Sequence, residues 1–285
     1  MEVLTIIAIL PVFLLCFYIY KKDKDKEPAV LLRKVFLFGM LSTIPILIIE
    51  LILNQIISFE DNFNLVGLFI AVLVGVGLIE EFFKWLVVYT KVYNHKEFNH
   101  AYDAIVYAVF ASLGFALIEN FLFVFSNGLG VGLMRALLTV PSHACNAIIM
   151  GFYFGKAKYE EYKGNQKESN KFMLYSLVFP ILAHTIYDFL LFSERNLLYV
   201  LFVIFIISLY MKCFKLIKKV AAINYNFDGT PVTYKSIDEI KVIPGNGPQK
   251  HVNSLESALY AVNKTVYICV IAIFIAICAL LFLNI

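Results

Sequence analysis

Long apolar stretches separated by short polar segments dominate this chain. Each stretch has about the 20 residues that an α-helix needs to cross the hydrocarbon core of a bilayer. The stretches are residues 3–20, 31–57, 65–89, 101–125, 131–154, 172–192, 197–211 and 266–283. The pattern therefore predicts an all-α, polytopic membrane bundle of about eight transmembrane helices.

Lysine and arginine are concentrated in alternate connections between these stretches. The first, third, fifth and seventh connections are basic, whereas the second is acidic, the fourth is neutral and the sixth has one residue of each sign. Basic loops remain in the cytoplasm. We therefore predict a multi-pass protein of the cell membrane with both termini extracytoplasmic.

The spacing of the stretches divides the chain into three parts. Residues 1–219 form a transmembrane core, residues 220–264 a small cytoplasmic segment, and residues 265–285 a C-terminal transmembrane helix. Turn-forming and β-prone residues in the segment 220–264 permit a small β element. Two roles remain open for it, a docking flap and an inert connection.

Composition supports a membrane location and excludes several other classes. Hydrophobic residues make up 61% of the chain, the mean hydropathy is +0.79, and the net charge is only +3. The five cysteines show no C-x-x-C spacing, so we expect small buried side chains rather than disulfides or a zinc cage. Because the basic residues follow loop topology and form no patch, we expect the lipid bilayer as a partner and no nucleic acid.

Two acids and a lysine interrupt the apolar stretch 65–89. An ionisable side chain at membrane depth costs several kcal/mol, so it usually faces a protein interior or a wet cavity. Lys84 is one helical turn from Glu80 and within reach of Glu81. The ammonium can hold one carboxylate ionised, and the other is then available to activate a water molecule.

The next two predicted helices also carry polar groups. Glu119 and Asn120 end a face of small residues in the stretch 101–125. His143 follows Pro141, which bends a helix and frees a backbone carbonyl, and Asn146 lies one turn further on. Packing alone requires neither the acid nor the imidazole.

A proline and a histidine recur in the stretch 172–192. His184 lies one turn after Pro180, and Asp188 lies one turn after His184, where its carboxylate can orient the imidazole. At about 1.5 Å per residue, four groups fall at one level in the middle of the bundle, with Glu119 and Asp188 nearer the outer side: Glu80, Glu81, His143 and His184. Four helices are thus predicted to bring acids and imidazoles into one buried layer, a composition typical of a hydrolytic centre.

The order of these residues resembles a known family. Glu80-Glu81-x-x-Lys84, Phe115-x-x-x-Glu119-Asn120, His143 and His184-x-x-x-Asp188 resemble the motifs of the PrsW family of intramembrane proteases. That family is distantly related to the CAAX prenyl endopeptidases and the bacteriocin-processing proteins. The resemblance covers roughly residues 20–191, including a loop at residues 20–28. It implies hydrolysis of a peptide bond in a single-span membrane protein, for which an anti-sigma factor in stress signalling is the candidate.

Three mechanisms remain compatible with these residues. The candidate catalytic residues are Glu80, Glu81, Lys84, Glu119, Asn120, His143, His184 and Asp188. In a glutamate-dependent protease without a cofactor, which we favour, one of the paired glutamates activates water and the histidines stabilise the oxyanion. In the second, zinc is bound by His143, His184 and Glu119, although no H-E-x-x-H motif is present. The third is a proton-coupled transporter or channel, but no inverted half-repeats are evident.

Overall fold

The computed structural model describes residues 1–56, 64–232, 234–235 and 240–241. Its helices are α1 (Glu2–Lys22), α2 (Ala29–Ile56), α3 (Leu65–Val72), α4 (Leu78–Lys91), α5 (Ala101–Met134), α6 (Val140–Tyr162), α7 (Gln166–Phe192) and α8 (Asn196–Ala221). Two π-helical turns, η1 (Leu73–Gly77) and η2 (Arg135–Thr139), lead into α4 and α6. The two-residue strands β1 (Tyr234–Lys235) and β2 (Ile240–Lys241) pair antiparallel. The predicted helical bundle is confirmed over the described residues.

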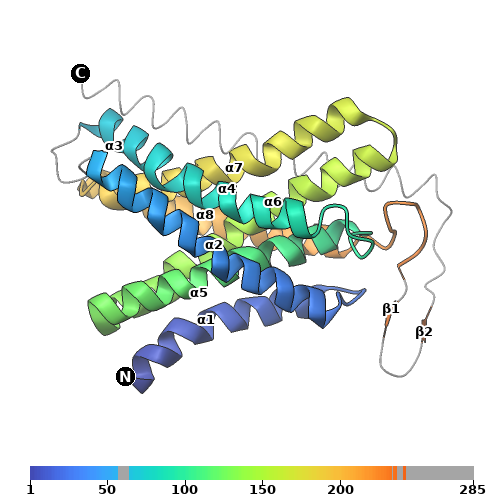
Figure 1. The fold of residues 1–285 in the computed structure, drawn as a ribbon, viewed down its shortest axis with the longest axis horizontal. Helices are drawn as coiled ribbons and strands as arrows, with labels where there is room; N and C mark the ends of the chain where they lie inside the picture. Colours follow the sequence, from blue (N-terminus) through green and yellow to red (C-terminus); the bar gives the residue numbers. More distant parts are fainter. Residues whose placement is uncertain (57–63, 233, 236–239, 242–285) are drawn as a thin grey trace.

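Within the described residues, six helical stretches are long and apolar enough to cross a membrane. The fourth, Ala101–Tyr162, has 62 residues. At 1.5 Å per residue its helix would be about 93 Å long, about three times the hydrocarbon thickness. The backbone breaks at Gly128, where φ is 82°, and α5 and α6 then pack along each other (Figure 1). This stretch therefore contains two of the predicted helices; the predicted helix at residues 266–283 lies outside the described part, so the count of eight is not confirmed.

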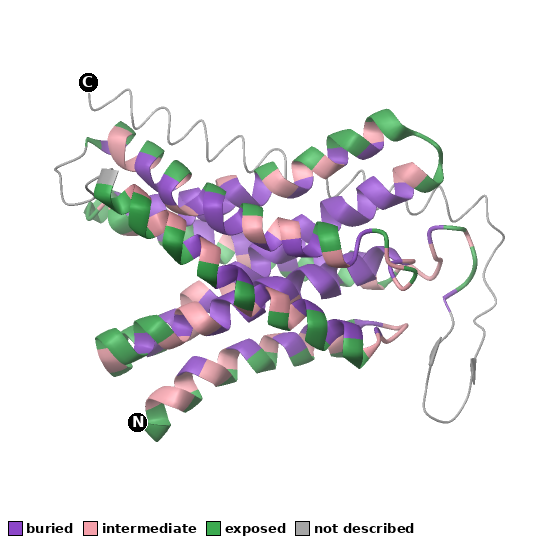
Figure 2. Ribbon diagram, viewed as in Figure 1, coloured by how far each residue is buried: buried purple, intermediate pink, exposed green. Residues whose placement is uncertain are grey.

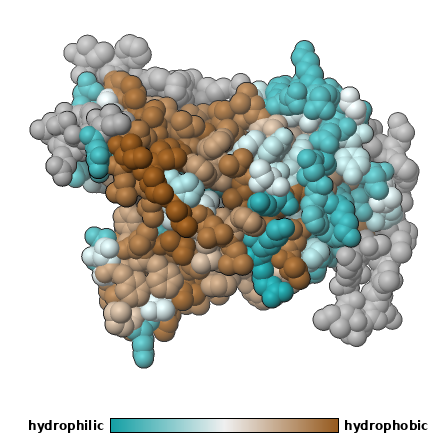
Figure 3. All heavy atoms as spheres, viewed as in Figure 1, coloured by the Kyte–Doolittle hydropathy of each residue, from teal (hydrophilic) through white to brown (hydrophobic). Residues whose placement is uncertain are grey.

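Helices α5, α6 and α7 form the centre of the bundle. The most apolar parts of the α5–α6 stretch and of α7 are 61% and 67% buried, compared with 22% for that of α1, and Figure 2 shows the same contrast between centre and periphery. The exposed side chains of α1, α2 and α8 are largely apolar, as on a lipid-facing surface. Figure 3 shows hydrophobic side chains over one part of the visible surface and polar ones near the Lys-rich connections.

Small residues bring the central helices into backbone contact. A Cβ atom added at Gly39 of α2 would lie 2.0 Å from the carbonyl oxygen of Ala111 in α5. On the next α5 turn, a Cβ at Gly114 would lie 2.2 Å from the carbonyl oxygen of Phe36. Such close approach is typical of packed membrane helices. It fixes α2 against the part of α5 that leads to Glu119.

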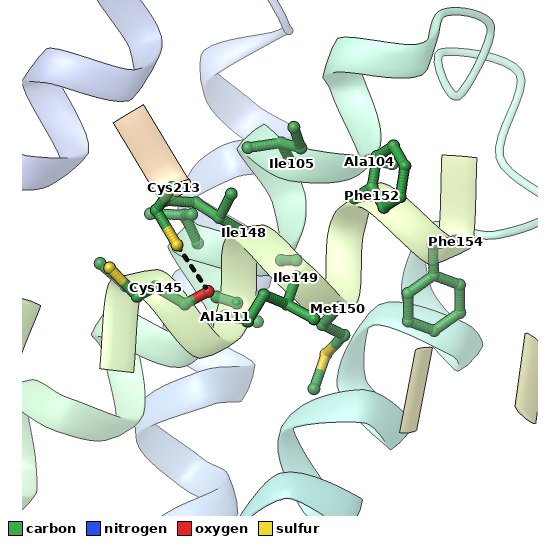
Figure 4. Packing of buried hydrophobic residues seen from close by; sticks show 14 of the residues in the cluster. Ala104, Ile105, Ala111, Cys145, Ile148, Ile149, Met150, Phe152, Phe154 and Cys213 are labelled. Carbon is green, nitrogen blue, oxygen red and sulfur yellow. Dashed lines mark hydrogen bonds between the residues drawn. The ribbon is translucent and has the colours of Figure 1, made fainter. Parts of the chain in front are cut away.

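The described cysteines pack as buried side chains, as the sequence predicts. Cys16, Cys145 and Cys213 are buried and free. The Cys213 thiol of α8 donates a 3.7 Å hydrogen bond to the backbone carbonyl of Cys145 in α6, among buried aliphatic residues (Figure 4). The other two cysteines fall outside the described residues.

The chain just after α8 packs against the connections at the Lys-rich end. The Phe227 amide donates to the carbonyl of Asn99, and the carbonyl of Ile223 lies 3.2 Å from Nε2 of His100. The Phe227 ring packs against Phe98. The first residues of the predicted segment 220–264 thus rest on the bundle; the cytoplasmic location and the role of that segment stay predictions.

Candidate functional site

Helix α4 presents its charged residues directly after the π-helical turn η1. Single π turns alter the rotation of a helix and are frequent at functional sites. Gly77 ends this turn, and a Cβ there would lie 2.5 Å from Oγ1 of Thr185 in α7. The missing side chain lets α4 approach α7 closely. Glu80 and Glu81 therefore lie beside the histidine of α7.

Lys84 lies at the centre of the site. Its Nζ is 2.8 Å from Oε2 of Glu80 and 2.9 Å from Oε1 of Glu81, so both contacts predicted within this helix are present. It also lies 3.3 Å from Nδ1 of His143 and 4.1 Å from the centroid of the Phe115 ring. The side chains of Lys84 and Glu81 are fully buried. One ammonium thus links two carboxylates of α4 to the imidazole of α6.

His184 lies between two carboxylates. Its Nδ1 is 2.8 Å from Oε1 of Glu81, and its Nε2 is 3.2 Å from Oδ2 of Asp188. The second contact is the one expected from residues one turn apart. Asp188 fixes the plane of the imidazole, and Glu81 connects that imidazole to Lys84.

His143 is held from its outer side by a second ion pair. Its Nε2 lies 2.8 Å from Oε2 of Glu119, and Nη2 of Arg135 lies 2.9 Å from the same oxygen. Nε of Arg135 donates to Oδ1 of Asn120 at 3.0 Å, and the Asn120 amide donates to the carbonyl of Ala8 in α1. Asn120 therefore connects α5 to α1 and η2, and in the described structure it forms no hydrogen bond with either of the paired glutamates.

The two imidazoles and the paired glutamates converge. One donor atom from each of Glu80, Glu81, His143 and His184 lies within 4.8 Å of the others. Glu119 lies behind His143 and is not part of this group. Three helices, α4, α6 and α7, thus contribute to this group, and Glu119 of α5 adjoins it through His143, so the predicted convergence is present.

This donor set fits a zinc-class metal ion. Each imidazole has its Nε2 against an outer carboxylate, Glu119 or Asp188, and its Nδ1 towards the paired glutamates and Lys84. Metal-ligating histidines are normally oriented by outer carboxylates in this way. Oε2 of Glu81 is buried and has no hydrogen-bond partner among the described residues. Two histidines and a glutamate form a known ligand set of catalytic zinc.

A cavity of about 570 Å³ adjoins the network, a volume within the usual range of ligand pockets. Its walls come from α2, the end of η1, α4, α5, η2, α6 and α7, and they are mostly apolar. Five network residues line it: Glu80, Glu119, His143, His184 and Asp188. Glu81 and Lys84 do not. The two adjacent glutamates are therefore distinct, since only Glu80 reaches the cavity.

Sequence reasoning missed two charged residues of this site. Arg135 lies in the apolar stretch 131–154 and Glu50 in the stretch 31–57, and both line the cavity. A charge lying inside an apolar stretch, away from the basic connections, was the signal that could have found each one. Asn146, one turn beyond His143, is buried, and its amide has no hydrogen bond in the described part of the chain.

Comparison with known proteins agrees with this geometry. A family model described as "PrsW family intramembrane metalloprotease" matches residues 27–211, more than half of the chain. The chain belongs to the PrsW family. Every network residue named above, from Glu80 to Asp188, falls within the matched range.

Relatives named Protease PrsW cover most of the chain. The protein of Oceanobacillus iheyensis is 41% identical over 71% of this chain and 91% of its own length. The protein of Bacillus subtilis strain 168 is 37% identical over 67% of this chain and 84% of its own length. No solved structure matches. PrsW membership makes this chain a multi-pass membrane protein of an intramembrane protease family, and it does not favour the transporter or channel alternative.

Proposed function

We propose that this protein hydrolyses a peptide bond of a single-span membrane protein inside the cavity, with Glu80 as the general base. The observation that supports this assignment is the difference between the adjacent glutamates. Glu80 lines the cavity, whereas Glu81 lies behind it against Lys84 and His184. The carboxylate that reaches the cavity can contact water and substrate, and its neighbour holds the site together.

The positions of these side chains are compatible with general-base hydrolysis of a peptide bond. Glu80 takes a proton from a water molecule, the water oxygen adds to the carbonyl carbon of the substrate, and the proton passes to the leaving nitrogen as the C–N bond breaks. The Lys84 ammonium, 2.8 Å from Glu80, orients that carboxylate. Asp188 and Glu119 hold His184 and His143 in the cavity wall, where an oxyanion would form.

We further propose that His143, His184 and Glu81 bind a zinc-class metal ion. When bound, such an ion would lower the pKa of a water molecule and polarise the carbonyl. This set replaces Glu119 of the sequence-based hypothesis with Glu81, because Glu81 belongs to the converging group and has an unpartnered buried oxygen. The metal-free alternative is supported by Lys84, whose ammonium already lies between both carboxylates.

Cleavage in a reconstituted system tests the proposed general base. The purified protein is placed in liposomes with tagged single-span substrates, an anti-sigma factor among them. Glu80→Gln keeps the shape of the side chain but removes its basicity, so we expect cleavage to fall by at least about a hundredfold, the usual contribution of general base catalysis. Glu168→Gln, at a half-buried position of α7 that does not line the cavity, serves as the control and retains wild-type cleavage. Wild-type cleavage by a folded Glu80→Gln variant would refute the assignment.

Metal analysis of the purified protein tests the proposed zinc-class site. We expect about one zinc per chain in protein purified without chelator, and little in His184→Ala. Chelation is expected to abolish cleavage, and added zinc to restore it. Full activity of demonstrably metal-free protein would instead establish the glutamate-dependent alternative.

A further inference from the structure

The α2 wall of the cavity carries polar side chains that the hydrolytic network does not use. Thr43, Glu50 and Asn54 all line the cavity. Their spacing of seven and four residues places them on one face of a helix. Helix α2 therefore presents a polar stripe, Thr43–Glu50–Asn54, to the space that Glu80 also faces.

Two members of this stripe lack partners in the described structure. Thr43 is 2% exposed, and its hydroxyl has no hydrogen-bond partner among the described residues. Glu50 forms no hydrogen bond or ion pair with any other residue that the structure describes. The other carboxylates lining the cavity each contact a lysine or a histidine: Glu80, Glu119 and Asp188. Polar groups without partners in an apolar wall are suited to a polar ligand, because leaving them unpaired costs free energy.

A membrane-spanning substrate presents such polar groups only when it is unwound. In a transmembrane helix, every backbone N–H and C=O is bonded within the helix, and unwinding exposes groups that lipid cannot satisfy. Same-facing groups of an extended chain recur at about 6.6 Å. Glu50 and Asn54 are separated by about 6 Å along the α2 axis. Glu50 and Asn54 thus offer hydrogen-bonding groups at close to the repeat of an extended backbone, and Thr43 offers a third group on the same face.

We propose that the Thr43–Glu50–Asn54 stripe binds the unwound backbone of the substrate beside the bond that is cut. Glu50 accepts a hydrogen bond from a substrate N–H, the Thr43 hydroxyl donates to a substrate carbonyl, and the Asn54 amide does either. These are positioning residues, and their role rests on the proposed protease function. The preferred substrates are then transmembrane segments with helix-weakening glycine or proline near the cleaved bond.

Substrate binding without turnover tests this role directly. In the Glu80→Gln background, a fluorescent single-span substrate is titrated against the protein in nanodiscs. We expect Glu50→Leu to weaken the Kd about tenfold, the upper part of the range for loss of one hydrogen bond. Glu50→Gln retains an acceptor oxygen and stays within about threefold of the parent. Ile48→Leu, on the exposed face of α2, is the matched control and binds like the parent.

Steady-state kinetics of the active protein distinguish an effect on substrate positioning from effects on the chemical step and on folding. We expect Glu50→Leu and Thr43→Val to raise KM while kcat and the melting temperature remain close to wild type. Unchanged Kd and KM in both variants would overturn the proposal. So would a Glu50→Gln variant with reduced kcat and unchanged KM, since that would place Glu50 in proton transfer. Failure of the protease function itself is recognised differently, as absence of substrate cleavage by the wild-type protein.

Discussion

Replacing Lys84 by leucine should destabilise the protein far more than loss of an ordinary lysine. The ammonium is fully buried and lies 2.8 and 2.9 Å from two carboxylates that are themselves almost inaccessible. Removing one partner of a buried ion pair leaves an uncompensated charge and costs about 3–5 kcal/mol. The upper part of that range is expected here, because Glu80 and Glu81 both lose their cation and then repel each other.

The assay is unfolding in mixed micelles, followed by circular dichroism as the fraction of denaturing detergent is raised. Lys84→Leu is compared with Glu81→Leu and with the double variant. The double variant should cost less than the sum of the single ones by at least about 1 kcal/mol, since residues in one ion-pair network couple by about 0.5–3 kcal/mol. Lys215→Leu, exposed on α8, is the control and should change stability by at most about 0.5 kcal/mol. A Lys84→Leu variant within about 1 kcal/mol of wild type, or strict additivity, would refute the view that Lys84 holds the site together.

Three further predictions address the surroundings of the site. Arg135→Leu should lower kcat about tenfold or more with little effect on the substrate Kd. The reason is that Glu119, which orients the imidazole of His143, loses its 2.9 Å contact with the guanidinium. A wild-type kcat in this variant would exclude a role of Arg135 in positioning Glu119. Gly39→Leu should prevent folding or lower the melting temperature strongly, since even a Cβ there would lie 2.0 Å from a carbonyl of α5, whereas unchanged melting would contradict the packing. Burial raises the pKa of Asp23 to about 7 and that of Glu27 to about 8 in the loop after α1. Both groups therefore contribute stability that is fully present below about pH 4 and is lost as the pH rises to 7–8. The double variant Asp23→Asn/Glu27→Gln should flatten the dependence of the melting temperature on pH between about pH 4 and 8.

Local spacing made part of the site predictable from the sequence. Contacts such as those of Lys84 with Glu80 and of His184 with Asp188 join residues one turn apart, and any α-helix brings such residues together. The apolar stretches were equally informative, because the bilayer thickness fixes the length of a spanning helix. The prediction that these groups share one level required only the rise per residue.

The contacts between helices were not predictable in the same way. The pairing of Glu119 with His143 and Arg135 depends on how α5, η2 and α6 rotate against one another. The rotation is changed by the π turns, and no periodicity in the sequence signals an i→i+5 hydrogen bond. For the same reason the sequence could not distinguish Glu80 from Glu81. Adjacent residues on a helix point about 100° apart, and only the packing of α4 on α7 decides which carboxylate faces the cavity.

The balance of charge in the network connects its structure to its chemistry. Four carboxylates contact the histidines and the lysine, and two cations accompany them, so the network carries a net charge of −2 when both imidazoles are neutral. The acids are Glu80, Glu81, Glu119 and Asp188, and the cations are Lys84 and Arg135. Buried charge of one sign is strongly unfavourable, so two positive charges must be supplied. A divalent metal ion between His143, His184 and Glu81 supplies them at once, and protons on the imidazoles supply them otherwise. Metal binding should therefore displace protons from the site. Proton release on addition of zinc is the measurement: a site that exchanges protons for zinc releases them, and a site that binds only protons does not.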